Sequence, residues 1–283
     1  MNIEIICPLY NAEEYIEKLD DSFKKQKNIE IKRITYILTE SNDSTENILD
    51  RLCGNYVKIK KEEFSHSLSR EKVAMKSDAD ILVFVTQDVE IRNDNWLEEL
   101  VKPIIENEVV ATFGRQLTKY DNIEKYTREK NYPDKSYVVS KDSLNTMGLR
   151  AFFFSDASSA IRADIFKKLN GYDGKNLPTN EDQYIAYKII TNGYKIKYCS
   201  DSVVYHSHNF TLKQLYKRYY ATGLFFAQES YIDNYGTDKT GGGLAIYILK
   251  RAIQDKNIKV ILRFLPDMVI RFIGMKVGKI SGK

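Results

Sequence analysis

The chain lacks the short motifs and long apolar segments that identify several protein classes. Its 14 glycines form neither G-x-G-x-x-G nor G-x-x-x-x-G-K-[ST], which counts against dinucleotide-dependent redox enzymes and P-loop proteins. No apolar run reaches the length of a transmembrane helix. The first residues also lack the basic and apolar regions of a signal peptide, so we expect a cytoplasmic protein.

Cysteine is scarce, and the three positions (Cys7, Cys53 and Cys199) do not have the spacing of a metal site. Three residues cannot all pair with one another. Cys7 and Cys199 lie in or beside apolar strand-like runs, so they are interpreted as reduced core residues of a cytosolic protein.

The net charge of +4 is unevenly distributed over the 283 residues. Residues 240–283 hold nine Lys/Arg and two Asp/Glu, a balance of +7, whereas the rest of the chain carries −3. A basic block at this end predicts a surface for an anionic partner. No recognised nucleic-acid-binding module accompanies it, so nucleic acid is not expected as the partner.

The first half of the chain alternates strand-like and helix-like segments. Strands are expected at residues 3–7, 31–38, 56–60 and 81–86, and helices at residues 12–26, 45–52 and 69–76. This alternation predicts an α/β fold with a Rossmann-like, mainly parallel central sheet flanked by helices. Farther on, a helix is expected at 96–106 and a strand at 109–113, and the tyrosine-containing polar segment from there to about residue 145 is interpreted as a mobile loop.

The strand at residues 81–86 leads into two carboxylates, Asp88 and Glu90. Five consecutive apolar residues, Ile81 to Val85, predict a central strand covered on both faces. Ligands of open α/β sheets bind outside the carboxyl ends of such strands. Paired oxygen ligands there suit Mg²⁺ or Mn²⁺ bound with a phosphate-bearing substrate, and capping of the next helix is the alternative.

Two further clusters carry chemistry. Glu181 and Asp182 precede a helical pattern, where carboxylates suit either capping or a base that stays ionised. His206 and His208 follow a strand-like run, and residues two apart in a strand face the same side, so both rings are predicted to approach one site.

These motifs, in this order, resemble a family-2 inverting glycosyltransferase of the GT-A fold. Residues 7–11 are similar to the opening nucleotide-binding turn, and residues 40–45 to the loop that contacts the base and ribose. Residues 86–90 are similar to the metal-binding D-x-D element, and residues 180–182 to the E-D motif that supplies the catalytic base.

Within that family the chain is most similar to bacterial rhamnosyltransferases. Residues 64–70 match an F-x-H-x-x-x-R loop that contains His66 and Arg70, and residues 205–211 match H-S-H-N-[YF]-[ST]. The guanidinium of Arg70 is expected to contact a phosphate or to form a structural ion pair. The sequence departs from the family's motifs at two positions. Glu40 replaces the usual Asp of the base- and ribose-contacting loop, and Glu90 occupies the second position of the metal-binding motif.

The resemblance implies a metal-dependent inverting transfer of L-rhamnose from dTDP-L-rhamnose onto a saccharide acceptor in bacterial surface polysaccharide synthesis. The alternatives are a UDP-hexose or UDP-N-acetylhexosamine donor on the same fold, or a non-catalytic nucleotide- or carbohydrate-binding protein. The implied roles are catalysis by Asp182 with Glu181; nucleotide-sugar binding by Pro8, Tyr10, Asn11, Glu40, Asn42, His66, Arg70, Gln87 and Asp88; and Mg²⁺ or Mn²⁺ binding by Asp88, Glu90, His206 and His208.

The chain is expected to divide into a catalytic domain at residues 1–212 and a helical, basic extension at residues 213–283. Residues 262–276 mix aromatic and aliphatic side chains with Arg and Lys, the composition of an interfacial helix lying on anionic lipid. Such a helix fits a lipid-linked acceptor at the cytoplasmic face of the membrane. Packing against the catalytic domain, or a homodimer interface, is the alternative.

Overall fold

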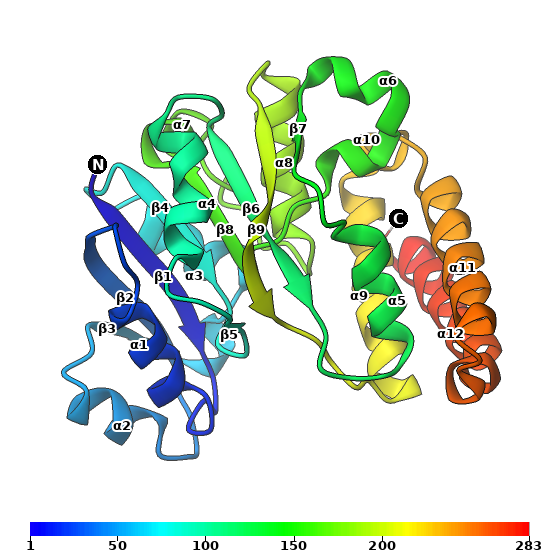
Figure 1. Cartoon of the computed structure of the whole chain (residues 1–283), viewed down its shortest axis with the longest axis horizontal. Coiled ribbons are helices and arrows are strands. Elements are labelled where there is room, and N and C mark those ends of the chain that lie inside the picture. The colour runs from blue at the N-terminus through cyan, green and yellow to red at the C-terminus, as the bar shows by residue number, and fades with distance from the viewer. Residues whose placement is uncertain (283) are drawn as a thin grey trace.

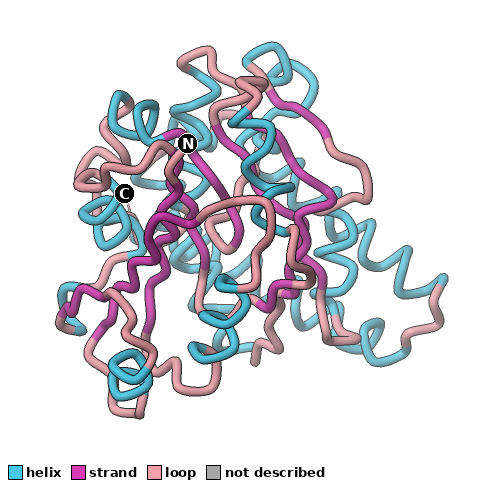
Figure 2. Tube along the Cα trace, turned by 60° about the vertical axis from the view of Figure 1, so that its left-hand side comes forward, coloured by secondary structure: helices cyan, strands magenta, loops and turns pink. Residues whose placement is uncertain are grey.

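The computed structural model describes residues 1–282, although it leaves the side chains of residues 237–240 undescribed. In this part of the chain nine strands form one sheet that crosses the middle of the molecule, with helices around it (Figures 1 and 2). The strands are β1 (Ile3–Leu9), β2 (Ile31–Thr39), β3 (Tyr56–Ile59), β4 (Ile81–Val85), β5 (Glu90–Ile91), β6 (Ala111–Leu117), β7 (Tyr137–Val139), β8 (Ser158–Arg162) and β9 (Ile196–Tyr205).

The strand order is β3-β2-β1-β4-β8-β6-β9-β5, and β7 also pairs with β9. The strands β1 to β4, β6 and β9 share one direction, whereas β8 runs antiparallel between β4 and β6. The short strands β5 and β7 are antiparallel to β9. The predicted mainly parallel α/β sheet is therefore confirmed.

Helices cover both faces of the sheet because its central strands are apolar on both sides. In β4, Ile81, Val83 and Val85 pack into one buried cluster, and Leu82 and Phe84 pack into the other. The helices are α1 (Ile16–Lys24), α2 (Thr45–Arg51), α3 (His66–Ala74), α4 (Trp96–Ile105), α5 (Ile123–Asn131), α6 (Leu144–Met147), α7 (Ala163–Lys168), α8 (Glu181–Thr191), α9 (Leu212–Gln228), α10 (Ser230–Asp233), α11 (Thr237–Gln254) and α12 (Ile258–Ser281).

The segment from residue 114 to about residue 145 is ordered, so its interpretation as a mobile loop was wrong. It contains the end of β6, helix α5 and strand β7. The Asn122 side chain accepts a hydrogen bond from the backbone N–H of Glu124 and so starts α5. Tyr126 is buried against Ile248 and Val260 of the C-terminal helices. Tyr126 and Tyr132 therefore belong to the core, whereas Tyr120 of the same segment is exposed.

The C-terminal helices α9 and α12 pack at very close range (Figure 1). A Cβ atom on Gly278 would collide with the backbone oxygen of Tyr220, and one on Gly223 would collide with that of Met275. Glycine at these positions allows the two helix backbones to touch. None of the helices in the described part of the chain is long and apolar enough to cross a membrane.

We predict that Gly278→Ala forces α12 away from α9 and lowers the free energy of unfolding by about 1–3 kcal/mol, the usual cost of overpacking. Urea denaturation measures the change. Gly243→Ala in α11 is the matched control, because a Cβ there meets open space. It should leave stability unchanged or raise it by up to about 1 kcal/mol. Equal effects of the two substitutions would contradict the close packing.

Candidate active site

A cleft of about 770 Å³ lies where the carboxyl ends of β1, β4 and β9 approach the first turn of α8. The parallel arrangement of these strands brings their ends to one edge of the sheet, although they are far apart in sequence. Of the residues singled out in the sequence, those that line the cleft are Pro8, Tyr10, His66, Arg70, Gln87, Asp88, Glu181, Asp182, His206 and His208.

Asp88, His206 and His208 form a compact cluster in this cleft. Oδ2 of Asp88 lies 3.5 Å from Nε2 of His206 and 3.6 Å from Nδ1 of His208. One ligand atom from each residue lies within 4.8 Å of the others, a spacing that could hold one metal ion. The prediction that both imidazoles approach one site is therefore confirmed.

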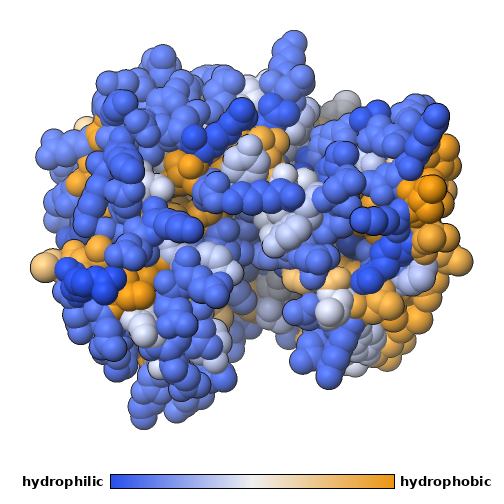
Figure 3. Space-filling view, turned by 60° about the horizontal axis from the view of Figure 1, so that its bottom comes forward, coloured by the Kyte–Doolittle hydropathy of each residue, from blue (hydrophilic) through white to orange (hydrophobic). Residues whose placement is uncertain are grey.

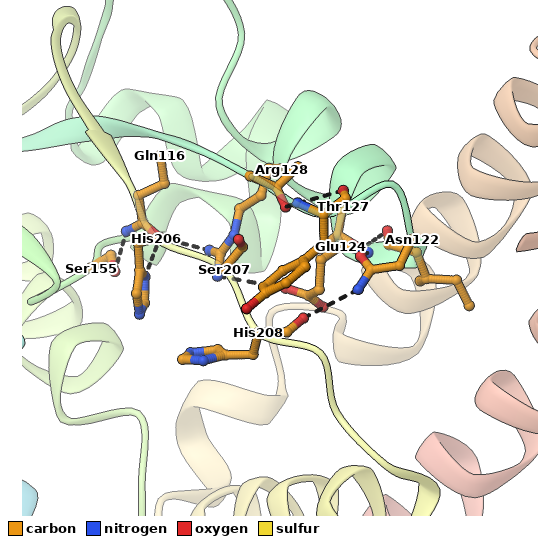
Figure 4. Close-up of polar contacts among 12 residues, drawn as sticks. Gln116, Asn122, Glu124, Thr127, Arg128, Ser155, His206, Ser207 and His208 are labelled. Atoms are coloured by element: carbon orange, nitrogen blue, oxygen red, sulfur yellow. Dashed lines mark hydrogen bonds and ion pairs between the residues drawn. The ribbon is translucent and has the colours of Figure 1, made fainter. Parts of the chain in front are cut away.

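The ring of His206 is oriented by the buried Gln116 of β6 (Figure 4). Oε1 of Gln116 accepts a hydrogen bond from Nη1 of Arg128 at 2.7 Å, which identifies it as the amide oxygen. The same oxygen lies 2.9 Å from Nδ1 of His206, so Nδ1 carries the proton. The lone pair of Nε2 then points toward Asp88, as in histidines that bind metals.

Burial controls the charge of this cluster. Burial alone raises the pKa of Asp88. His206 and then His208 outweigh this effect, because both rings are protonated in the acid range where Asp88 titrates. Together they hold the pKa of Asp88 well below its usual value. Burial lowers the pKa of His206, and burial together with His206 lowers that of His208 to about 4. At neutral pH the cluster therefore presents one carboxylate and two neutral imidazoles.

Glu90 lies outside this cluster. It is on β5, which pairs with the end of β9, and its exposed side chain forms an ion pair with Lys119. Of the two carboxylates that follow β4, the structure brings only Asp88 to the histidines.

Arg70 forms a buried ion pair in the wall of the cleft. Its Nη1 lies 3.2 Å from Oε1 of Glu181 and donates to the backbone oxygen of His66 at 2.8 Å. The pair therefore ties the first turn of α3 to the first turn of α8. Of the two roles expected for Arg70, the structural ion pair is the one seen.

Asp182 is set in an acidic environment. Its Oδ1 accepts a hydrogen bond from the backbone N–H of Gln183 at 2.7 Å. Burial, followed by the charges of Glu181 and Asp156, raises the pKa of Asp182 well above its ordinary value. A carboxylate with a raised pKa is a stronger base, so Asp182 is suited to accept a proton from a bound hydroxyl group.

Asp156 is a residue that the sequence analysis missed, since no motif surrounds it. It lies at the cleft, and its carboxylate accepts hydrogen bonds from Ser159 at 2.8 Å and from Tyr172 at 2.9 Å. Burial raises its pKa to about 6, although Arg70 opposes the shift.

The expected nucleotide-binding residues divide into two groups. Gln87 and Tyr10 hold the ends of β4 and β1 together, because the Gln87 side chain exchanges hydrogen bonds of 2.7 and 3.0 Å with the Tyr10 backbone. Asn11, Glu40 and Asn42 are exposed and do not line the cleft. Oδ1 of Asn11 accepts from the Asn42 backbone at 3.1 Å, which joins the loops that follow β1 and β2.

Comparison with known proteins identifies the family. Residues 4–170 match the sequence model described as Glycosyl transferase family 2. The chain belongs to that family. It is 33% identical to the O-antigen chain rhamnosyltransferase WbaN of Salmonella anatum, over 97% of this glycosyltransferase and 88% of that protein. It is 32% identical to RfbN, an O-antigen chain rhamnosyltransferase of Salmonella typhimurium, over 99% and 90% of the two chains.

Solved structures confirm the GT-A fold of this glycosyltransferase. Mannosyltransferase PcManGT from Pyrobaculum calidifontis, in complex with GDP-Man and Mn²⁺, has a TM-score of 0.66 at 12% identity, with 99% and 86% of the two chains covered. S. aureus TarS 1–349 in complex with UDP-GlcNAc has a TM-score of 0.59 at 16% identity, with 99% and 92% covered.

Three arginines that the sequence did not single out also line the cleft of the glycosyltransferase: Arg128, Arg218 and Arg271. Arg128 lies in the segment that was interpreted as a mobile loop, and Arg271 lies in the basic extension at residues 213–283. Arg218 lies on α9, within the predicted helical extension at residues 213–283. No spacing rule connects the three, because their proximity comes from the packing of α5, α9 and α12.

We predict that Arg70→Met lowers the free energy of unfolding by about 3–5 kcal/mol, because it leaves Glu181 as a buried, unpaired charge. The double variant with Glu181→Gln should recover most of this loss. Urea denaturation measures both. Lys58→Met, which breaks an exposed ion pair with Glu46, is the control and should have little effect. A similar small effect of Arg70→Met would contradict a buried pair.

Proposed function

We propose that this glycosyltransferase moves L-rhamnose from dTDP-L-rhamnose onto a saccharide acceptor in surface polysaccharide synthesis, with a divalent cation and with inversion. The observation that carries the proposal is the meeting of the Asp88–His206–His208 cluster with Asp182 in one cleft. The rhamnose donor is supported by the two relatives named O-antigen chain rhamnosyltransferases, which match nearly the whole chain.

A carboxylate oxygen and two neutral imidazole nitrogens are a suitable donor set for a divalent cation. Asp88, His206 and His208 would supply these three ligands, and oxygens of the donor diphosphate would complete the coordination. When bound, the cation offsets the negative charge that develops on the departing nucleoside diphosphate. Two nitrogen ligands favour Mn²⁺ over Mg²⁺, which prefers coordination by oxygen alone.

Asp182 would serve as the base. Asp182 lines the cleft, and its Oδ1 accepts from the backbone N–H of Gln183. No described residue donates a hydrogen bond to Oδ2, so this oxygen is available to an acceptor hydroxyl group. In a single displacement, Oδ2 takes the proton of the acceptor hydroxyl while that oxygen bonds to the anomeric carbon. The bond from the anomeric carbon to the diphosphate breaks, and the configuration at that carbon inverts.

Arg218 is a second source of positive charge for the diphosphate. It is exposed at the cleft and packs over the Phe210 ring at 5.6 Å, and it forms no ion pair with any residue that the structure describes. Arg70 and Arg271, in contrast, are already paired with carboxylates. An unpaired guanidinium beside the histidine cluster is suited to bind phosphate oxygens.

Binding of nucleotides tests the proposal. We expect dTDP and dTDP-rhamnose to raise the melting temperature most in the presence of Mn²⁺, less with Mg²⁺ and little with EDTA, because a ligand that binds only the native state stabilises it. Asp88→Ala should abolish the metal-dependent shift, and the control Glu90→Ala should retain it. A larger shift of the melting temperature with UDP or GDP would indicate a donor with that nucleotide in place of dTDP. No shift with any nucleotide would contradict the proposal.

The pH dependence of transfer tests the base. Because Asp182 must be ionised, kcat/KM should fall as the pH drops through its raised pKa. Asp156→Asn removes a negative charge that raises this pKa, so the acid limb of the profile should move to lower pH. Asp182→Asn should lose transfer but keep donor binding, so its residual rate gives the background of the assay. An acid limb that does not move in Asp156→Asn would contradict the assignment.

A further inference from the structure

Helix α12 has the reverse of the usual amphipathic arrangement. Asp267, Arg271 and the close-packed Gly274 and Gly278 face the protein. The opposite side is apolar and exposed, where Leu262, Leu265, Phe272 and Ile280 are 74%, 68%, 63% and 72% exposed, respectively. A helix normally buries its apolar side.

The exposed apolar side chains form one continuous stripe. Their spacing along α12, in steps of three, seven and eight residues, keeps them on one side of the helix. Ile246 and Ile253 of the neighbouring α11 are likewise exposed, at 71% and 57%. Figure 3 shows apolar residues gathered along one edge of the molecule, on the side where Figure 1 places α11 and α12. An exposed patch of this kind marks a binding surface.

The charge around the stripe identifies its partner as anionic. Residues 241–282 contain eight Lys/Arg and two Asp/Glu. Lys250, Lys256 and Lys276 are exposed and form no ion pair within the described part of the chain. Lys276 projects from the middle of the stripe, with Nζ 5.6 Å from the centre of the Phe272 ring. A two-fold dimer through the stripe would oppose the positive charges of both copies.

A lipid surface accepts this combination. Basic side chains beside an apolar helical face allow the apolar groups to enter the bilayer while the ammonium groups contact anionic headgroups. With 24 residues, α12 is about 36 Å long. It is not apolar enough to cross a membrane, as noted above, so it would lie along the surface.

We propose that the exposed side of α11 and α12, which we term the apolar stripe (Ile246, Ile253, Leu262, Leu265, Phe272 and Ile280), docks this protein onto an anionic lipid bilayer. Leu244 and Arg271 of the same helices line the cleft, so docking would place the cleft beside the membrane. The docking is independent of the proposed function, since it rests on the surface of two helices and on no catalytic residue.

Co-sedimentation of the full-length protein with vesicles tests this proposal. The wild type should bind vesicles of phosphatidylcholine with phosphatidylglycerol far better than vesicles of phosphatidylcholine alone, and added salt should weaken binding. The combined variant L262Q, L265Q and F272Q should lose about tenfold or more of the binding. Its matched control replaces three exposed apolar residues elsewhere (V57Q, M75Q and V138Q) and should bind as the wild type does.

The contribution of charge is tested separately. The combined variant K250Q, K256Q and K276Q should lose roughly a hundredfold in binding to anionic vesicles, whereas K18Q, K72Q and K141Q together should lose little. Melting curves with nucleotide confirm that each variant is folded. Absence of wild-type binding to anionic vesicles would overturn the proposal. Sedimentation velocity that shows a dimer abolished by the apolar variant, without vesicle binding, would assign the stripe to a second copy instead.

Discussion

The active site depends on the partial burial of Asp88, His206 and His208 together at the carboxyl edge of a parallel sheet. Burial keeps the histidines neutral, and Asp88 stays ionised beside them. The nitrogen lone pairs of the two rings therefore lie close to the negative charge of the Asp88 carboxylate. Such an arrangement is unfavourable unless a cation can be accommodated there. The need to hold these three groups in place accounts for many of the contacts around the cleft.

The supporting contacts extend well beyond the cluster. Gln116 on β6 orients His206, Arg128 on α5 fixes the orientation of Gln116, and Ser155 accepts from the Gln116 amide at 2.7 Å. Asn122, the cap of α5, donates to the backbone oxygen of His208 at 3.4 Å. Helix α5, which lines this side of the cleft, thus also stabilises the positions of both histidines. Similarly, the Arg70–Glu181 pair holds the first turn of α8 and with it Asp182.

Much of the site could be predicted from the sequence because it follows periodic strands. The apolar run before Asp88 has no alternation, and the two-residue spacing of the histidines places them on one side of an extended segment. Glu90 could not be predicted in the same way, because its position depends on the pairing of β5 with β9, a long-range contact. The places of Tyr126 and Arg128 were missed for a related reason, because they depend on the packing of α5 against α11 and α12.

The most direct measurement is anomalous diffraction at the manganese edge from crystals grown with Mn²⁺ and dTDP. The account predicts one strong peak within coordination distance of Oδ2 of Asp88, Nε2 of His206 and Nδ1 of His208, with the diphosphate between that ion and Arg218. A peak at Glu90, or a nucleotide bound in the cleft without an ion at this cluster, would contradict it.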